Sequence, residues 1–257
     1  DGALILQVQG DGPVQLAVAE ARNGLAYRAT ATVRGEVGAQ ADLAAMLNPQ
    51  GQGRCALTLD PSDRQPGVQP YQGVVALQDE SGKPFARLSQ AVEHYMKQSE
   101  QLDTKLVLAA NVDTAAGLLI QRLPLEGEAN LAAQLSPEQQ IELEDAFPRI
   151  AMKAATLSDA ELLDLPIDTL LHRLFWEENL RRYDPGVPTF SCSCSRERVG
   201  RMLVGLGREE VDSVLAERGE VEIGCQFCGA QYRFDPVDCV QLFAAAGSVQ
   251  PAQGGLQ

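Results

Sequence analysis

Two short motifs, Cys192-Ser193-Cys194 and Cys225-Gln226-Phe227-Cys228, stand in the last quarter of this 257-residue chain and contain four of its six cysteines. Two thiolates on one loop and two on another can surround Zn²⁺ as a tetrahedron, with Zn–S distances of about 2.3 Å. The paired spacing therefore predicts a four-cysteine zinc centre, with one zinc ion per chain, in a small C-terminal domain.

A domain of roughly 50 residues buries too little apolar surface to offset the entropy lost when its chain is ordered. Structural Zn²⁺ contributes on the order of 10–16 kcal/mol of apparent binding free energy, and this binding is coupled to folding. We therefore expect residues 189–246 to be folded with metal and largely unfolded without it. Four protein ligands leave no open position for a water molecule, which favours a structural or regulatory zinc over a catalytic one.

The same cysteines also allow redox chemistry. Each has a second cysteine two or three positions away, so either pair could form a disulfide without long-range rearrangement. Zinc holds the sulfurs as thiolates, the form that oxidants attack. Oxidation would remove the ligands and unfold the domain. A permanently inert zinc knuckle is the alternative, and the two motifs alone leave both interpretations open.

Composition limits the classes of function. The net charge of −14 and the isoelectric point of about 4.6 disfavour binding to nucleic-acid phosphates and to anionic membranes. No apolar run reaches the ~18 residues of a membrane span, and no signal peptide is recognisable. Paired cysteines in such a chain favour metal or redox chemistry in the cytoplasm. Because the chain opens at Asp1 directly in strand-like sequence, we expect an upstream segment to be missing.

Residues 1–125 are expected to form a sheet-rich α/β core domain. Tyr27, Ala29, Ala31 and Val33 alternate with polar residues, which is typical of a half-buried strand. Helical spacing of apolar residues interrupts the strands between positions 84 and 100. The stretches predicted to be strands are 4–8, 14–18, 27–33, 55–59, 73–77, 105–110 and 117–123. The predicted fold class is mixed α+β.

Residues 126–188 change to helical character and are expected to form a conditionally stable linker. Ser136 and Ser158 each begin a capping-box pattern. Pro137, Pro148 and Pro166 are predicted to divide the linker into short helices. An apolar stripe is formed by Ile167, Leu170, Leu171, Leu174 and Phe175, and Trp176 is predicted to project from the opposite face.

The zinc domain is expected over residues 189–246. Ser195 is a candidate cap for a helix reaching Gly205, a second helix should span 208–218, and strands 221–223 and 231–234 should place the Cys225 motif and Gly229 at the knuckle of a hairpin. Cys239 and Cys55 lie among apolar residues and are predicted to pack in the interior. Residues 247–257 are expected to be a flexible tail.

Two other classes of function fit parts of the sequence. The Cys225-x-x-Cys228 pair could exchange disulfides as in a thiol oxidoreductase, although it lacks the βαβ context of thioredoxin-like motifs. A zinc-ribbon binding module is the other alternative, but residues 190–240 contain six arginines against nine acidic residues, which suits phosphates poorly. His94 and His172 lie among apolar helical residues and are interpreted as packing or surface residues. No catalytic residue is predicted.

Motifs throughout the chain resemble those of the 33-kilodalton heat-shock protein chaperones. The matching residues are Phe190-Ser191-Cys192-Ser193-Cys194-Ser195-Arg196-Glu197-Arg198, Glu210-Val211-Asp212-Ser213, Cys225-Gln226-Phe227-Cys228-Gly229, Gln9-Gly10-Asp11-Gly12-Pro13, Tyr71-Gln72-Gly73-Val74-Val75 and Tyr95-Met96-Lys97-Gln98-Ser99-Glu100-Gln101-Leu102. The resemblance covers nearly the whole chain. It departs from the family pattern at the N-terminus, where the family's first helices and first strand are absent.

The resemblance implies an ATP-independent holdase. In the reduced form, Cys192, Cys194, Cys225 and Cys228 would bind one Zn²⁺ and the chaperone would be idle. Oxidants would form Cys192–Cys194 and Cys225–Cys228 disulfides and release the metal. The zinc domain and the linker would then lose order, homodimers would form, and exposed apolar surface would capture unfolding client proteins. The resemblance implies neither an enzyme nor a nucleic-acid or membrane partner.

Overall fold

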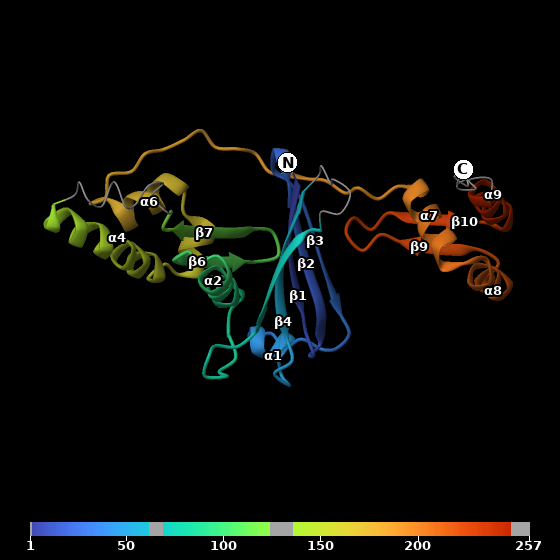
Figure 1. Cartoon of the computed structure of the whole chain (residues 1–257), viewed down its shortest axis with the longest axis horizontal. Coiled ribbons are helices and arrows are strands. Elements are labelled where there is room, and N and C mark those ends of the chain that lie inside the picture. The colour runs from blue at the N-terminus through green and yellow to red at the C-terminus, as the bar shows by residue number, and fades with distance from the viewer. Residues whose placement is uncertain (1, 62–68, 124–135, 248–257) are drawn as a thin grey trace, which may run out of the picture. The chain divides into compact units, whose positions relative to one another are not determined.

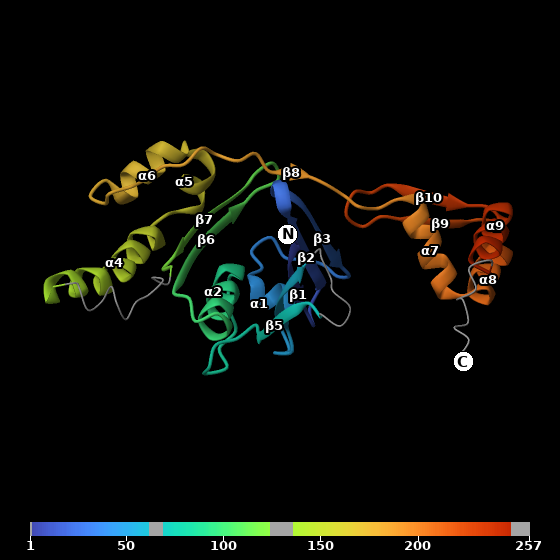
Figure 2. The same cartoon turned by 45° about the horizontal axis from the view of Figure 1, so that its top comes forward.

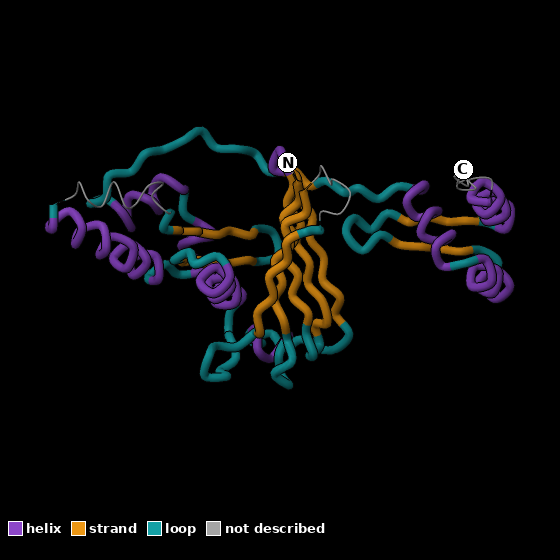
Figure 3. Tube along the Cα trace, in the orientation of Figure 1, coloured by secondary structure: helices purple, strands orange, loops and turns teal. Residues whose placement is uncertain are grey.

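The computed structural model describes residues 2–61, 69–123 and 136–247, so the expected tail falls almost wholly outside the described residues. The chain divides into two compact units, Asp1–Leu25 with Ala31–Pro188 and Ala26–Thr30 with Thr189–Gln257. Helices and strands alternate irregularly along it (Figure 3). The expected mixed α+β class is confirmed.

An antiparallel sheet forms the centre of the first unit. Its strands are β1 (Gly2–Gln9), β2 (Val14–Arg22), β4 (Arg54–Pro61) and β5 (Tyr71–Ala76), which follow one another in the order β5-β4-β1-β2. Figure 1 labels β1, β2 and β4. The alternating apolar residues that predicted these strands bring Val8 opposite Cys55, and both side chains are buried. The four predicted strands in this part of the chain are therefore confirmed.

Two helices, α1 (Leu43–Leu47) and α2 (Leu88–Ser99), contribute to the core of this sheet. Tyr95 is almost fully buried and its hydroxyl donates a 3.1 Å hydrogen bond to Glu100 Oε1. The ring lies against Gly73 so closely that a Cβ there would come within 2.6 Å of it. A side chain at position 73 would therefore displace Tyr95 from the core.

The β6–β7 hairpin (Thr104–Ala110 and Ala115–Gln121) carries three helices, α4 (Pro137–Ala155), α5 (Asp159–Asp164) and α6 (Ile167–Phe175) (Figure 2). They share a second core with the hairpin. Its buried members are Val107, Ala109, Ala154, Leu157, Leu162, Leu170 and Phe175. The described part of the expected linker is thus packed on strands of the same unit.

The linker differs from expectation in two places. The prediction that Pro148 breaks the helix was wrong, because α4 continues through it; beyond it, Ile150 and Ala154 pack into the core, and this packing offsets the hydrogen bond that proline removes. The apolar stripe is also narrower than predicted. Ile167 is 69% exposed, whereas Leu170 and Phe175 are buried, because Ile167 is the first residue of α6.

Other linker predictions are confirmed. Ser158 and Glu161 form the expected capping box of α5, and α4 begins at Pro137. Trp176 is 67% exposed, as its position off the stripe predicted. Two acidic residues that follow α6 form ion pairs with basic residues of α4. Arg149 donates two hydrogen bonds to Glu178, of 3.1 and 3.0 Å, and Lys153 Nζ lies 3.2 Å from Glu178 and 3.0 Å from Glu177.

The second unit contains β8 (Thr189–Phe190), α7 (Arg196–Leu206), α8 (Arg208–Arg218), β9 (Val221–Gly224), β10 (Gln231–Phe234) and α9 (Pro236–Gly247). Ser195 caps α7 by accepting the Arg198 N–H at 3.2 Å, as predicted. The core is small, with Leu203, Phe234 and Cys239 at its centre. Among the described residues, no helix has the length and apolar composition needed to cross a membrane.

Strand β3 (Ala26–Val33) contributes its first five residues to the second unit, where Ala26 and Tyr27 pair in parallel with β8. The sequence predicted that the apolar face of this strand is buried, and that prediction was wrong. Tyr27 and Val33 are 46% and 53% exposed, while Arg28 and Thr30 are half-buried. The polar side chains are covered because they contact the two cysteine loops.

Candidate metal centre

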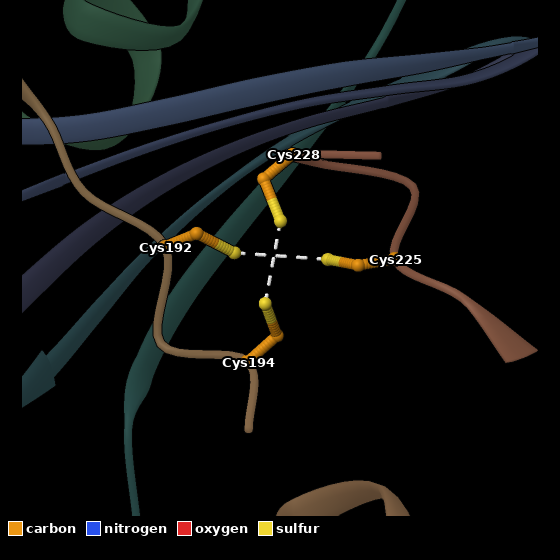
Figure 4. Close-up of side chains that lie close together, drawn as sticks. All are labelled: Cys192, Cys194, Cys225 and Cys228. Atoms are coloured by element: carbon orange, nitrogen blue, oxygen red, sulfur yellow. Dashed lines mark hydrogen bonds between the residues drawn. The ribbon is translucent and has the colours of Figure 1, made fainter. Parts of the chain in front are cut away.

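The four paired cysteines meet at one point of the second unit. Cys192 and Cys194 lie on the loop between β8 and α7, and Cys225 and Cys228 lie on the turn between β9 and β10. Figure 4 shows all four side chains pointing toward a common centre, and their sulfur atoms lie within 4.8 Å of one another. The structure therefore brings together all four residues that the motifs singled out.

The spacing of the sulfurs fits a metal ion. Cys192 Sγ lies 3.6 Å from Cys225 Sγ, and Cys194 Sγ lies 3.3 Å from Cys228 Sγ. A regular tetrahedron of four sulfurs around zinc, with 2.3 Å bonds, has edges of about 3.8 Å. All four thiols are free. An all-sulfur donor set of these dimensions could hold a metal ion.

The hairpin knuckle forms because its turn satisfies its own backbone groups. Cys225 N–H donates to Ala230 O, and Gly229 N–H donates to Cys225 O, both at 2.8 Å. Gly229 adopts a φ of 73°, a left-handed conformation that glycine accepts without strain. The predicted placement of the motif and Gly229 at the knuckle is confirmed. The turn holds Cys225 and Cys228 on the same side.

Two of the four thiols have pKa values that are shifted in opposite directions. The Cys194 backbone N–H, together with hydrogen bonds from the neighbouring thiols, lowers the pKa of Cys192 to about 6. At Cys228 the Ala230 N–H lowers the pKa, but the thiol of Cys194, burial and the other cysteines raise it to about 12. Cys192 therefore ionises more readily than an ordinary thiol, whereas Cys228 ionises less readily. A bound cation would supply the charge that lets all four be thiolates.

Side chains outside the motifs also reach the sulfurs. A hydrogen bond with the Cys194 side chain, followed by burial and the negative charge of the cluster, raises the pKa of Tyr232 to about 12. Arg28 Nη1 donates to Ser193 Oγ at 3.1 Å and lies 4.0 Å from Cys192 Sγ. Sequence reasoning missed both residues. Arg28 is 164 positions from Cys192, so only tertiary structure reveals the contact; Tyr232 could have been found from its place on the strand after the knuckle.

The remaining candidates lie elsewhere. Cys55 is fully buried, and burial raises the pKa of its thiol to about 11. Cys239 is 2% exposed within α9, and its burial likewise raises its pKa. His94 packs against Phe85, with the two ring centroids 5.3 Å apart, and His172 is exposed on α6. The predicted packing and surface roles of these residues are confirmed, and among the described residues only the four paired cysteines form a metal-ligating group.

Comparison with known proteins decides the family. The family model described as Hsp33 protein matches residues 1–235. This chain belongs to the Hsp33 family. The 33 kDa chaperonin of Methylobacillus flagellatus is 43% identical over 242 residues, covering 94% of this chain and 74% of the relative. That of Shewanella loihica is 39% identical over 253 residues, covering 98% and 79%.

The fold agrees with a solved member of the Hsp33 family. The crystal structure of the 33 kDa chaperonin of Thermotoga maritima superposes with a TM-score of 0.69 over 96% of this chain and 79% of that chain, at 18% identity. The resemblance drawn from the motifs is therefore confirmed. The chain belongs to a family of chaperones, and its four-cysteine cluster is compatible with redox regulation.

Proposed function

We propose that this chain is a redox-regulated, ATP-independent holdase. It is idle while Cys192, Cys194, Cys225 and Cys228 bind one Zn²⁺, and it captures unfolding proteins after these cysteines are oxidised. The observation that carries the proposal is the convergence of the four sulfurs within 4.8 Å from two separate loops. Because the ligands join two loops of a unit with a small core, removing them removes much of what orders that unit.

Zinc is the metal that the donor set favours. Thiolates are soft ligands, and four of them in a tetrahedral arrangement suit Zn²⁺. A structural zinc site of this kind needs no open position for water or substrate. The four cysteines would hold the ion between the loop before α7 and the β9–β10 turn, so that binding would cross-link the two. The polypeptide supplies the hydrogen bonds that keep the thiolates in place, from the Cys194 and Ala230 backbone N–H groups.

Activation is a two-electron oxidation in each motif. Two thiolates lose two electrons to the oxidant and form one S–S bond, while peroxide is reduced to two molecules of water or hydroxide, or hypochlorite is reduced to chloride and hydroxide. We propose the pairs Cys192–Cys194 and Cys225–Cys228, which stay within their own loops. The closest sulfurs in the reduced structure belong to opposite loops, so peptide mapping of oxidised protein must distinguish the two pairings.

The metal-dependent unit is proposed to control the linker, residues 126–188, between a core domain at 1–125 and a zinc domain at 189–246 that ends in the tail 247–257. The described helices α4–α6 expose Ile167, and Trp176 directly after α6 is exposed too. These helices are joined to the chain after α6 by ion pairs of Arg149 with Glu178 and of Lys153 with Glu177. Loss of their order would uncover the apolar residues that now cover β6–β7. Such surface is suited to unfolding clients and to homodimer formation.

The same proposal includes several exclusions. The chain acts by stoichiometric binding and has no catalytic site, and its acidic charge argues against nucleic-acid and membrane partners. The reducing cytoplasm is its proposed compartment, because free thiols persist there.

The proposed function can be tested by following the aggregation of a heat-sensitive test protein by light scattering. The reduced, zinc-loaded chain should leave aggregation unchanged, and the peroxide-treated chain should suppress it. Equal protection in both states would reject the redox switch. Sustained turnover of a model disulfide such as insulin would instead indicate a thiol oxidoreductase.

A further inference from the structure

One short strand segment, Ala26–Thr30, contacts both cysteine loops of its unit. Its backbone pairs with β8, and the Tyr27 O atom accepts the Ser191 N–H at 2.9 Å, immediately before the first motif. At its other end, Thr30 Oγ1 donates to the Gln226 carbonyl at 2.8 Å, inside the second motif. Arg28 lies between these contacts and is half-buried.

Two guanidinium groups converge on the first cysteine loop. Arg28 Nη1 donates to Ser193 Oγ at 3.1 Å, and Arg198 Nη1 donates to the same oxygen at 2.9 Å. A hydroxyl oxygen has two acceptor positions, so both bonds can form together. Of these two arginines, Arg28 is the one placed against a sulfur, with its Nη1 4.0 Å from Cys192 Sγ.

The second cysteine loop fixes the same side chain from the other direction. The Arg28 guanidinium carbon lies 4.2 Å from the centre of the Phe227 ring, a cation–π contact within the second motif. Stacking on Phe227 and donation to Ser193 leave the guanidinium little freedom to move. Its charge is therefore held beside the cluster rather than in solvent.

The charge of the centre explains why such a contact matters. Four thiolates and one Zn²⁺ carry a net charge of −2, and an arginine is always positive. A fixed cation near a thiolate stabilises the anion, and thiolates of lower basicity are weaker nucleophiles. Attack of a neutral peroxide on Cys192 should therefore be slower with Arg28 in place.

We propose that Arg28 is a positioning residue of the metal centre that slows oxidation of Cys192 and so sets how much oxidant is needed to release the metal. The inference rests on the proposed function, since it assigns a role toward the same four thiolates. Arg28 acts on the sulfur by its charge and its stacked geometry. Phe227 and Ser193 hold it there.

The test compares Arg28→Gln, Arg28→Lys and Arg201→Gln with the unaltered full chain. Arg201 is exposed on α7 and provides the same loss of charge outside the two motifs. Zinc release under peroxide is followed with a chelating dye. We expect release about tenfold faster in Arg28→Gln, the scale of one charge-assisted contact, an intermediate rate in Arg28→Lys, and the unaltered rate in Arg201→Gln.

A spectroscopic measurement separates this role from general destabilisation. With Co²⁺ in place of zinc, the sulfur-to-cobalt charge-transfer band should move to longer wavelength in Arg28→Gln, because the thiolate becomes more electron-rich. Arg28→Lys should restore most of that shift. The proposal would be overturned if Arg28→Gln left both the charge-transfer band and the rate of zinc release unchanged. It would also be overturned if Arg28→Lys and Arg28→Gln gave the same band position and the same rate.

A second variant covers the case in which Arg28→Gln fails to fold. Phe227→Leu removes the stacking partner and keeps the charge, and it should accelerate zinc release in the same direction by a smaller factor. An unaltered rate in Phe227→Leu would then overturn the proposal. If the unaltered chain releases zinc but never protects clients, the proposed function fails while this comparison of rates remains valid.

Discussion

Cys194 Sγ lies 3.3 Å from Cys228 Sγ although 34 positions separate the two residues in the sequence. The contact joins the loop that leads into α7 to the knuckle of the β9–β10 hairpin. Around it the unit has only a small core centred on Leu203, Phe234 and Cys239. The sulfur cluster therefore holds separate segments of this unit together, a role that a larger apolar core has in a bigger domain.

Replacing one ligand tests this dependence. Cys228→Ser should abolish tight zinc binding and raise amide hydrogen exchange across α7–α9 even without oxidant, because three thiolates cannot complete the shell. Cys239→Ala is the matched control in the same unit, since it removes a buried sulfur that is not in the cluster. One zinc per chain at unaltered affinity in Cys228→Ser would refute the ligand assignment.

Removing the metal should affect the two units differently. Under reducing conditions, a strong chelator should expose the amides of α7, α8 and the β9–β10 hairpin while those of β1 and β4 stay protected. The reason is that the first unit has its own core around Val8, Cys55 and Tyr95. Hydrogen exchange followed by mass spectrometry measures both regions together. Continued protection of α7–α9 in metal-free protein would contradict the expected dependence on zinc.

The ion pairs that join α4 to the end of α6 should influence the order of the linker. Glu178→Gln removes one carboxylate that pairs with both Arg149 and Lys153 and should raise the rate of limited proteolysis in residues 136–188 by roughly two- to fivefold. Glu177→Gln is the control, since Glu177 is 55% exposed and pairs with Lys153. It should have a smaller effect, and equal rates in both variants would argue against a special role for Glu178.

Acid should loosen the same contact. Hydrogen bonds from Arg149, then from Lys153, lower the pKa of Glu178 below its ordinary value of 4.5. A group whose pKa is depressed by folding stabilises the folded state above its ordinary pKa, and this contribution is lost as the pH falls through the lowered value. Trp176 is the one tryptophan of the chain and lies two residues away. Its fluorescence should change below about pH 4.5 in the unaltered chain.

The Glu178→Gln variant is the reference for this titration. Its glutamine does not titrate, so the acid-induced change in Trp176 fluorescence should be smaller. Identical acid profiles in the two proteins would assign the change to other carboxylates.

Sequence reasoning succeeded wherever the signal was local. The spacing of the two motifs identified all four clustered cysteines. Alternation of apolar residues located β1 and β2, and strand-like apolar stretches located β4 and β5. Caps were equally local, as Ser158 and Ser195 show. Short elements carry too little periodicity to be recognised, which is why α1 and β8 were missed.

The errors arose where tertiary contacts override a local preference. The sequence of β3 predicts a strand whose apolar face is buried, but the cysteine loops cover its polar residues Arg28 and Thr30 instead. Pro148 is tolerated because residues beyond it pack into the core. A contact such as that between Arg28 and Cys192 has no local signature, since it depends on where two distant segments fold.

The most direct test of the account is a peroxide titration in which zinc release and protection of a heat-aggregating client are measured on the same samples. Zinc release and client protection should rise together and saturate at the loss of one zinc per chain. Complete zinc release with no gain in protection, or full protection while the metal is still bound, would contradict this expectation.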